Sequence, residues 1–433
     1  MSPVDAPPLA EVLQQAAMVW RLFRAGQSLD RAIAAVVDKR PNLRPAVQDA
    51  SYSAVRHLAA SERIIERLSA RTPARDVAAL LAVSLAQLQS GRYGDHVVVD
   101  QAVSAARSSP KTRAASGFVN ALLRTFVRER ESLLADLRVD EVVHYNLPRW
   151  WIERLQRAYP PDWKAIAESQ QQPPPLVLRV NTSRLSVDAY LRTLQDLGIS
   201  AMRVGPQALW MHEPRPVSAI PGFSAGDVSI QDGGAQLAAS WLDARPGMRV
   251  LDACAAPGGK TAHLAELGAT DLTALEVDPD RALRIEENLR RIGVAARIVI
   301  GDARQPDTGV LYERILLDAP CTASGIVRRH ADIPWLRRPT DVAQLTTVQR
   351  ELLDALWPLL TPGGRLLYVV CSLFPEEGRE QINRFLERRP DARQVPLPAA
   401  QLLPTSTSVA AWQDCGLPTL HDGFFYALLE KTR

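Results

Sequence analysis

Hydrophobic residues recur at helical spacing along the first third of the chain. Their separation by three and four positions is that of one face of a helix. Six such stretches cover residues 10–24, 29–37, 47–68, 77–88, 97–106 and 118–127. Gly26 follows the first stretch as a helix-ending signal, and Ser28 precedes the second as a cap for the helix N-terminus. Because none of this region alternates between apolar and polar residues as a strand does, residues 1–140 are predicted to form an all-helical domain.

The pattern becomes mixed over residues 141–225. A short connector containing Trp150 and Trp151 leads into an amphipathic stretch, and three consecutive prolines follow as a rigid spacer. A strand, a helix and a second strand are then expected at 176–181, 187–197 and 208–211. The region is therefore predicted to hold a connector and a small α+β subdomain. The two tryptophans could stack on nucleic-acid bases, but aromatic residues at a domain junction favour packing.

From residue 226 to the end, strands alternate with helices, which is typical of a doubly wound, mostly parallel sheet. Strands are expected at 249–253, 272–277, 297–300, 314–318, 365–370 and 424–429. Helices are expected at 259–267, 279–292, 342–360 and 375–389. The stretch 314–318 is almost entirely apolar, as in a strand buried on both faces. Residues 226–433 are thus predicted to form a Rossmann-like α/β domain.

Composition is that of a soluble globular protein, with 46% hydrophobic and 23% charged residues. No apolar run is long enough to span a membrane, and the start lacks the pattern of a secretion signal, so we expect a cytoplasmic protein. Four cysteines in such a chain indicate reduced thiols. Residues 1–140 hold 19 Lys+Arg against 14 Asp+Glu, which allows either a packing domain or a basic RNA-binding module.

A glycine-rich turn at residues 254–261 follows the strand predicted at 249–253. A dinucleotide site would need G-x-G-x-x-G, which is absent. The tail Gly259-Lys260-Thr261 fits a phosphate-binding P-loop, but Cys254 stands where its first glycine should be. The third possibility is a site for S-adenosylmethionine (SAM), with an acid ending the first strand and a glycine-rich turn behind it.

Acidic residues at the ends of later strands favour SAM. Glu276 ends the second strand, where an acid can bond both ribose hydroxyls; Asp302 follows the third and Asp318 ends the fourth. Ligands of such sheets bind beyond the carboxyl ends of the strands. Several acids there suit a sulfonium compound and would repel the phosphates of ATP.

Two cysteines lie just past strand ends. Cys321 follows the fourth strand and Cys371 the fifth, so if these strands are neighbours both thiols open onto one pocket. Two reduced thiols beside a methyl donor indicate covalent catalysis. Carbon 5 of a pyrimidine becomes nucleophilic once a thiolate has added to C6. Cys254, between two alanines, is expected to be an inert thiol.

Several motifs resemble the RNA cytosine-C5 methyltransferases of the NOL1/NOP2/Sun group. These are DACAAPGGKT at 252–261, LDAPCTASG at 317–325, RRH at 328–330, CS at 371–372 and PEE at 375–377. The helical region, with VRH at 55–57, LLAVSLAQL at 80–88 and VNALLR at 119–124, resembles the NusB-type RNA-binding fold. With DGFFYA at 422–427, the whole chain is similar to the bacterial members of the group that act on 16S rRNA.

The resemblance implies specific roles. Cys371 would attack cytosine C6, Cys321 would help to release the methylated RNA, and Asp318 would lie between cofactor and base. Glu276 would hold the ribose of SAM and Asp302 its adenine side. The methionine end would be held by Cys254, Ala255, Ala256, Pro257, Gly258, Gly259 and Lys260. The base must be flipped out to reach Cys371. A monomer acting on 16S rRNA without a metal is expected; the alternative is a non-catalytic antiterminator-type RNA-binding protein.

Four positions depart from the family pattern. Glu276 stands where Asp is usual, Thr322 where Ser is usual, Val370 where Thr is usual and Gly378 where Asn is usual. The last two remove polar groups near the expected site.

A basic cluster after Cys321 is expected to contact RNA phosphates. Its members are Arg328, Arg329, Arg337 and Arg338.

Overall fold

The computed structural model describes residues 7–307, 309–404 and 416–432, which divide into two compact units. The first unit is drawn from the chain up to Arg157 together with His330–Arg337. The second is drawn from Ala158–Arg329 and from Arg338 onward. This division differs from the predicted boundary at 140, and it groups the small subdomain with the large α/β domain. Cys415 lies outside the described residues.

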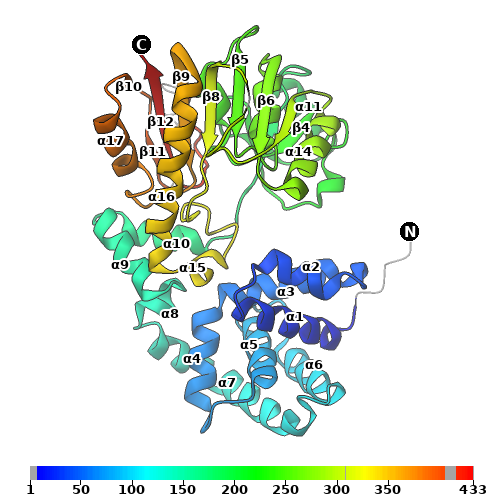
Figure 1. The fold of residues 1–433 in the computed structure, drawn as a ribbon. Coiled ribbons are helices and arrows are strands. Elements are labelled where there is room, and N and C mark those ends of the chain that lie inside the picture. The colour runs from blue at the N-terminus through cyan, green and yellow to red at the C-terminus, as the bar shows by residue number, and fades with distance from the viewer. Residues whose placement is uncertain (1–6, 308, 405–415, 433) are drawn as a thin grey trace. The chain divides into compact units, whose positions relative to one another are not determined.

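The first unit is helical, and no strand occurs among its described residues. Its helices are α1 (Leu9–Arg24), α2 (Leu29–Val37), α3 (Arg44–Arg56), α4 (Leu58–Leu68), α5 (Arg75–Ser90), α6 (Asp95–Ser108), α7 (Ser116–Leu137), α8 (Glu141–Tyr145) and most of α9 (Arg149–Ala158). Helix α5 is buried along most of its length and contacts α1, α3, α4 and α6 (Figure 1). The all-helical prediction is confirmed. One element was wrong: 47–68 is not a single helix, because the backbone leaves helical geometry at His57.

Residues 330–337 lie between two stretches of the second unit in the sequence but belong to the first unit. They include the short helix α15 (Ile333–Leu336). The Asp332 carboxylate accepts a hydrogen bond of 2.9 Å from the backbone N–H of Leu29, at the start of α2. Ala331 is buried in the helical core, and Trp335 packs against it. Apolar burial and a cap on α2 therefore hold this segment.

The second unit begins with α10 (Trp163–Gln171) and a four-stranded antiparallel sheet in the order β2-β3-β1-β4. Its elements are β1 (Leu176–Val180), α11 (Val187–Asp196), β2 (Ala201–Arg203), β3 (Ala208–Met211) and β4 (Val228–Ile230). Leu178 and Val180 of the sheet share a core with Tyr190 and Leu194 of α11. The expected α+β subdomain is confirmed, with two further strands of three residues each that the hydrophobic pattern did not reveal.

The main sheet has the order β10-β12-β9-β8-β5-β6-β7, and β11 pairs with β12. Its strands are β5 (Arg249–Ala253), β6 (Asp271–Glu276), β7 (Arg297–Ile300), β8 (Tyr312–Asp318), β9 (Leu360–Val370), β10 (Ala392–Val395), β11 (Gln401–Leu402) and β12 (Phe424–Lys431). Strands β9, β8, β5, β6 and β7 run parallel, and β12 is antiparallel to β9. The Rossmann-like prediction is confirmed, including the pairing of β8 with β9.

Helices cover both faces of this sheet. They are α12 (Leu237–Leu242), α13 (Gly259–Glu266), α14 (Pro279–Ile292), α16 (Pro339–Leu356) and α17 (Arg379–Arg388). Ile315 and Leu317 share a core with α16 and α17, whereas Leu316 packs with α12 and α13 on the opposite face. The chain adds β6 and β7 on one side of β5 and then β8 on the other. The loops after β5 and β8 therefore diverge at a topological switch point, where a ligand can enter.

Candidate active site

The glycine-rich turn joins β5 to α13. Gly258 has φ +90°, and a Cβ added there would lie 3.0 Å from the Cα of Ile285 in α14. Glycine thus allows the turn to lie against that helix. Glu276, at the end of the neighbouring strand β6, accepts a hydrogen bond of 3.1 Å from the backbone N–H of Ala256. The second strand end therefore holds the turn in place.

One cavity of about 390 Å³ collects the predicted chemistry. From the predicted set, its lining includes Cys254, Ala256, Glu276, Asp302, Asp318, Cys321 and Cys371. The carboxyl ends of β6, β7, β8 and β9 thus contribute to one pocket. Ala255, Pro257, Gly258, Gly259 and Lys260 shape the turn but do not line this cavity.

Asp302 carries a partner of its own. Its two carboxylate oxygens accept hydrogen bonds from the Arg304 guanidinium, at 2.7 Å from Nη2 to Oδ2 and 3.1 Å from Nε to Oδ1. These bonds hold the pKa of Asp302 below its usual range. Arg304 therefore orients the Asp302 carboxylate. Contact between Asp302 and an adenine stays a prediction.

The two cysteines meet at the ends of adjacent strands. Asp318 of β8 stands opposite Val369 of β9, so the following loops start side by side. The Sγ atoms of Cys321 and Cys371 lie 3.5 Å apart. The hydrogen bond with Cys371, followed by burial, raises the pKa of Cys321 well above its usual value. Cys321 is therefore held as a neutral thiol beside Cys371.

Lys260 approaches the same place from the glycine-rich turn. Its Nζ lies 2.6 Å from Oδ2 of Asp318. Burial alone would lower the pKa of Lys260, but the charge and the hydrogen bond of Asp318 outweigh it and raise the pKa. An ammonium group thus lies beside Asp318, and Cys371 adds to its electrostatic surroundings.

Asp252 is the penultimate residue of β5, behind the turn, and is fully buried. Its Oδ2 accepts a hydrogen bond of 2.6 Å from Thr261 Oγ1, whereas its Oδ1 is buried with no hydrogen-bond partner among the described residues. Burial raises the pKa of Asp252 to about 7. A buried acceptor without a donor fits a ligand that brings a cationic or N–H group to the turn. The sequence motif contains Asp252, but the motif alone gave it no role.

Cys254 lines the cavity as a half-buried residue. Burial raises its pKa to about 12, and the carboxylates of Asp318, Glu276 and Asp252 add to the shift. A thiol that stays protonated is a poor nucleophile, which agrees with the expectation that Cys254 is inert.

Family profiles match most of the chain. The profile for 16S rRNA methyltransferase RsmB/F covers residues 239–430, that for the RsmF/B-like ferredoxin-like domain covers 147–218, and the NusB family covers 12–128. Ribosomal RNA small subunit methyltransferase B of Citrobacter koseri is 38% identical over 428 residues, which are 95% of this chain and 97% of that protein.

The chain belongs to the RsmB family of 16S rRNA methyltransferases.

Two further proteins agree. Ribosomal RNA small subunit methyltransferase B of Klebsiella pneumoniae is 39% identical over 425 residues, which are 95% of this chain and 96% of that protein. The crystal structure of the protein titled PH0851 has a TM-score of 0.77 and 26% identity, and covers 99% of this chain and 100% of that one. The resemblance drawn from the sequence is therefore confirmed, and rRNA is the substrate class of this RsmB-family chain.

Arg328 is buried in this RsmB-family chain, whereas Arg329 is partly exposed. Arg328 is buried, pairs with Asp422, and donates a hydrogen bond of 2.7 Å to the carbonyl of His421. Arg329 pairs with Asp422 and, at 2.9 Å, with Asp232. Both guanidinium groups are thus paired with carboxylates of the same unit, and phosphate contact by Arg328 and Arg329 stays a prediction.

The other two arginines lie elsewhere. Arg337 is half-buried at the end of the segment that belongs to the first unit, and Arg338 is exposed at the start of α16. Their contact with RNA stays a prediction.

Trp151 is fully buried, as the packing interpretation expected. No described helix is long and apolar enough to cross a membrane, and no cluster of potential metal ligands occurs in the described part of the chain.

The structure shows the surroundings of three residues that depart from the family pattern. The Thr322 hydroxyl donates a hydrogen bond to the Glu377 carboxylate, so threonine keeps the hydroxyl group of the usual serine. Val370 is fully buried in the sheet core, where no polar group is needed. A Cβ on Gly378 would lie 2.9 Å from the ring of Phe425, so this glycine allows close packing.

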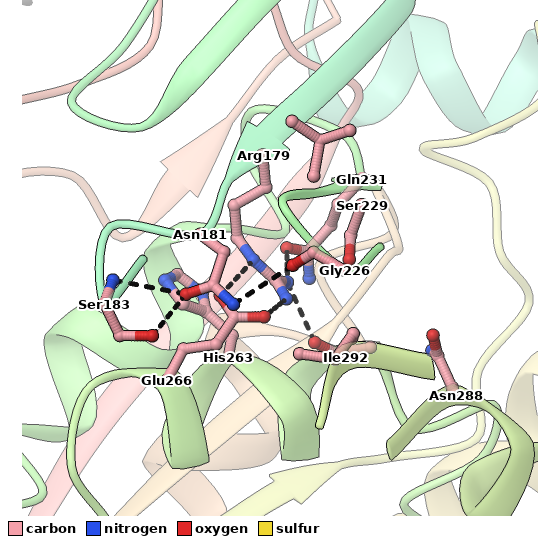
Figure 2. A network of polar contacts seen from close by, with 12 residues as sticks. Arg179, Asn181, Ser183, Gly226, Ser229, Gln231, His263, Glu266, Asn288 and Ile292 are labelled. Atoms are coloured by element: carbon pink, nitrogen blue, oxygen red, sulfur yellow. Dashed lines mark hydrogen bonds and ion pairs between the residues drawn. The ribbon is translucent and has the colours of Figure 1, made fainter. Parts of the chain in front are cut away.

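A buried arginine supports the glycine-rich turn from behind. Figure 2 shows Arg179 of β1 reaching Glu266 of α13, with bonds of 2.7 Å from Nη2 and 3.1 Å from Nε. Its Nη1 donates to the carbonyl of Gly259 at 2.9 Å and also to Gln231. The α+β subdomain is thereby tied to α13, the helix that follows the glycine-rich turn. The sequence offered no signal for this pairing, since the partners are 87 residues apart.

Proposed function

We propose that this methyltransferase transfers a methyl group from SAM to C5 of a cytosine in 16S rRNA, with Cys371 as nucleophile and Cys321 assisting release. The observation that carries the proposal is the 3.5 Å separation of the two sulfurs in a cavity lined by the acids at three strand ends. Such a pair suits a reaction in which one thiol bonds the base and the other acts on that bond.

The residues present fit SAM. Its positive charge suits a cavity lined by Glu276, Asp302 and Asp318, and the unpartnered oxygen of Asp252 suits the ammonium of its methionine part. We assign the ribose to Glu276, the adenine side to Asp302, and the methionine end to the turn from Cys254 to Lys260. When bound, SAM supplies the methyl group.

Cys371 begins the reaction as a thiolate that adds to C6 of the flipped cytosine. A carbon–sulfur bond forms, and the electron pair of the C5–C6 double bond makes C5 nucleophilic. Asp318 can accept a hydrogen bond from the amino group of the base, and its pairing with Lys260 at 2.6 Å keeps its carboxylate oriented. These contacts hold C5 toward the methyl donor.

Cys321 acts when the product leaves. After methylation the C5 proton passes to a base in the solvent, the C5–C6 double bond re-forms, and the bond from C6 to sulfur breaks so that Cys371 leaves as a thiolate. The Cys321 thiol, 3.5 Å away and held protonated, can donate a hydrogen bond to the departing Cys371 sulfur. A better-stabilised leaving group shortens the life of the adduct.

Two single variants test the mechanism with radiolabelled SAM and transcribed 16S rRNA. Cys371→Ala should lose methyl transfer yet bind SAM in calorimetric titration; full activity would refute the nucleophile assignment. Cys321→Ala should accumulate a protein–RNA adduct that survives denaturing electrophoresis, and no adduct would refute its role in release. Cys415→Ala removes a thiol without a proposed role and serves as the matched control.

The target base and the assembly need separate measurements. Bisulfite sequencing of 16S rRNA from cells without this protein should show one cytosine that loses protection. Reaction of the enzyme with a transcript in which that cytosine is replaced should then yield no methylation.

We expect a monomer, which sedimentation analysis tests directly. Arg337 and Arg338 are proposed as phosphate contacts, and Arg338→Ala should weaken RNA binding and reduce its salt dependence.

A further inference from the structure

A buried carboxylate joins the two cysteine loops. Glu377 is fully buried, ahead of α17. Its Oε1 accepts hydrogen bonds from the backbone N–H of Thr322 at 2.8 Å and from Nε2 of Gln349 at 3.2 Å. Its Oε2 accepts from the hydroxyls of Thr322 and Ser372. One side chain therefore receives four hydrogen bonds from three segments.

The partners of Glu377 adjoin the reacting groups. Thr322 directly follows Cys321, and Ser372 directly follows Cys371. The carboxylate thus bridges the residues next to both sulfurs. Each loop is held at the peptide that carries its cysteine.

Further bonds stiffen the same bridge. Ser324 Oγ lies 3.0 Å from Ser372 Oγ and accepts a bond of 2.8 Å from the backbone N–H of Leu373. The backbone N–H of Gly325 donates to the carbonyl of Cys371 at 2.9 Å. The loops after β8 and β9 therefore form one hydrogen-bonded unit with Glu377 at its buried end.

Burying a carboxylate is unfavourable unless every acceptor site is met by a donor. Burial raises the pKa of Glu377, while the hydrogen bonds from Ser372 and Thr322 oppose the rise. An apolar side chain would fill the same space without the desolvation cost of a carboxylate, but it could not accept hydrogen bonds from both loops. The carboxylate, in contrast, accepts hydrogen bonds from the residue that follows each cysteine.

We propose that Glu377 is a positioning residue whose carboxylate sets the distance between the sulfurs of Cys321 and Cys371, and that release of methylated RNA depends on this distance. The proposal rests on the two-cysteine function above. Glu377 acts on this distance through its hydrogen bonds with Thr322 and Ser372.

The first test measures the distance without RNA or SAM. Treatment of the full chain with the thiol oxidant diamide should join Cys321 to Cys371, as two thiols lose two hydrogens to the oxidant. In Glu377→Ala this disulfide should form about 100-fold more slowly, because misplacing reacting groups by ~1 Å can cost that factor. An unchanged rate would overturn the proposal. Mass spectrometry of the linked peptide follows the reaction.

Glu377→Gln separates geometry from charge. The amide oxygen can accept from the Thr322 N–H, and the amide NH₂ can donate to the two hydroxyls after they rotate. The disulfide rate in Glu377→Gln should therefore stay within about tenfold of the parent, above that of Glu377→Ala. Equal loss in both variants would overturn the bridging role. Glu380→Ala, which removes an exposed carboxylate paired with Arg384 on α17, is the matched control and should leave the rate unchanged.

The second test follows catalysis. In Glu377→Ala we expect kcat for methyl transfer to fall about 100-fold with little change in KM for RNA, and the protein–RNA adduct to accumulate. Unchanged SAM affinity separates this from general damage to the fold; loss of SAM binding together with activity would overturn the positioning role. If Glu377→Ala fails to fold, Ser372→Ala removes one arm of the bridge and should slow disulfide formation in the same direction.

The two proposals fail differently. Full activity of Cys371→Ala would refute the catalytic function but would leave the disulfide measurement valid. A normal disulfide rate in Glu377→Ala would refute the positioning role while the cysteine mechanism stands.

Discussion

The ion pair between Arg179 and Glu266 allows a quantitative test of what ties the α+β subdomain to the large α/β domain. Neither side chain has meaningful exposure, at 0% and 2%, and the contact is bidentate (Figure 2). Arg179→Met removes the guanidinium but keeps a side chain of similar reach. It leaves the Glu266 carboxylate buried without its counter-charge.

The expected loss is large. Removing one partner of a buried pair costs about 3–5 kcal/mol, because the remaining charge is desolvated and uncompensated. That is a large share of the ~5–15 kcal/mol by which domains are stable. For a unit of this size the loss corresponds to a drop in Tm on the order of 10 °C.

The double variant Arg179→Met/Glu266→Met gives the diagnostic comparison. Replacing a buried ion pair with apolar side chains is often neutral, so the double variant should recover most of the stability lost by the single change. The two single losses should therefore be strongly non-additive. Additive losses would show that the pair is not coupled and would refute the reasoning.

Thermal and urea unfolding of the full chain measure these effects. Because the chain has two units, the relevant transition is the one that moves upward when SAM is added. The control is Arg290→Met, which breaks an exposed pair with Glu286 on α14. That change should cost no more than about 0.5 kcal/mol, as is usual for surface pairs at this spacing.

Three further changes follow from the same structure. His263 is buried and its pKa lies well below the usual value, so only the unfolded chain takes up this proton below pH ~6.5, and stability falls as pH falls. His263→Gln should remove up to ~1.4 kcal/mol per pH unit of that dependence in urea unfolding at pH 7.5 and 5.5, and an unaltered slope would exclude His263 as a source. Gly325→Ala would place a Cβ 2.0 Å from the carbonyl oxygen of Gly423, so we expect about 1–3 kcal/mol of lost stability by calorimetry. Lys260→Met removes the cation beside Asp318 and should lower kcat by on the order of 100-fold; wild-type turnover would show that this charge does not act in the reaction.

The hydrophobic pattern was enough to place the proposed catalytic groups along the chain. A buried parallel strand is a nearly unbroken apolar run, so its carboxyl end can be read to within a residue or two. Asp318 and Cys371 could therefore be assigned to one edge of the sheet before any coordinates were known. Their actual proximity depended on β8 and β9 being neighbours, which the structure confirms.

Pairings between distant residues could not be read in the same way. Arg328 and Asp422 are 94 positions apart, and the sequence reveals two charges but not that they are buried together. Because the sequence does not show these carboxylate partners, the basic cluster of Arg328, Arg329, Arg337 and Arg338 was interpreted as a surface for RNA. Likewise, nothing local indicates that residues 330–337 pack with the helical unit, because Ala331 and Trp335 find their apolar surroundings only after folding.

Lys260 shows why the letters of a motif do not fix its ligand. In a phosphate-binding loop the lysine of Gly-Lys-Thr offers its charge to phosphate oxygens. Here the same charge is bonded to Asp318 at 2.6 Å, and Thr261 is bonded to the buried carboxylate of Asp252. A phosphate would meet two carboxylates in the place where it needs free donors. The turn is thus electrostatically matched to a cationic ligand, and its lysine is directed to the strand end that precedes Cys321.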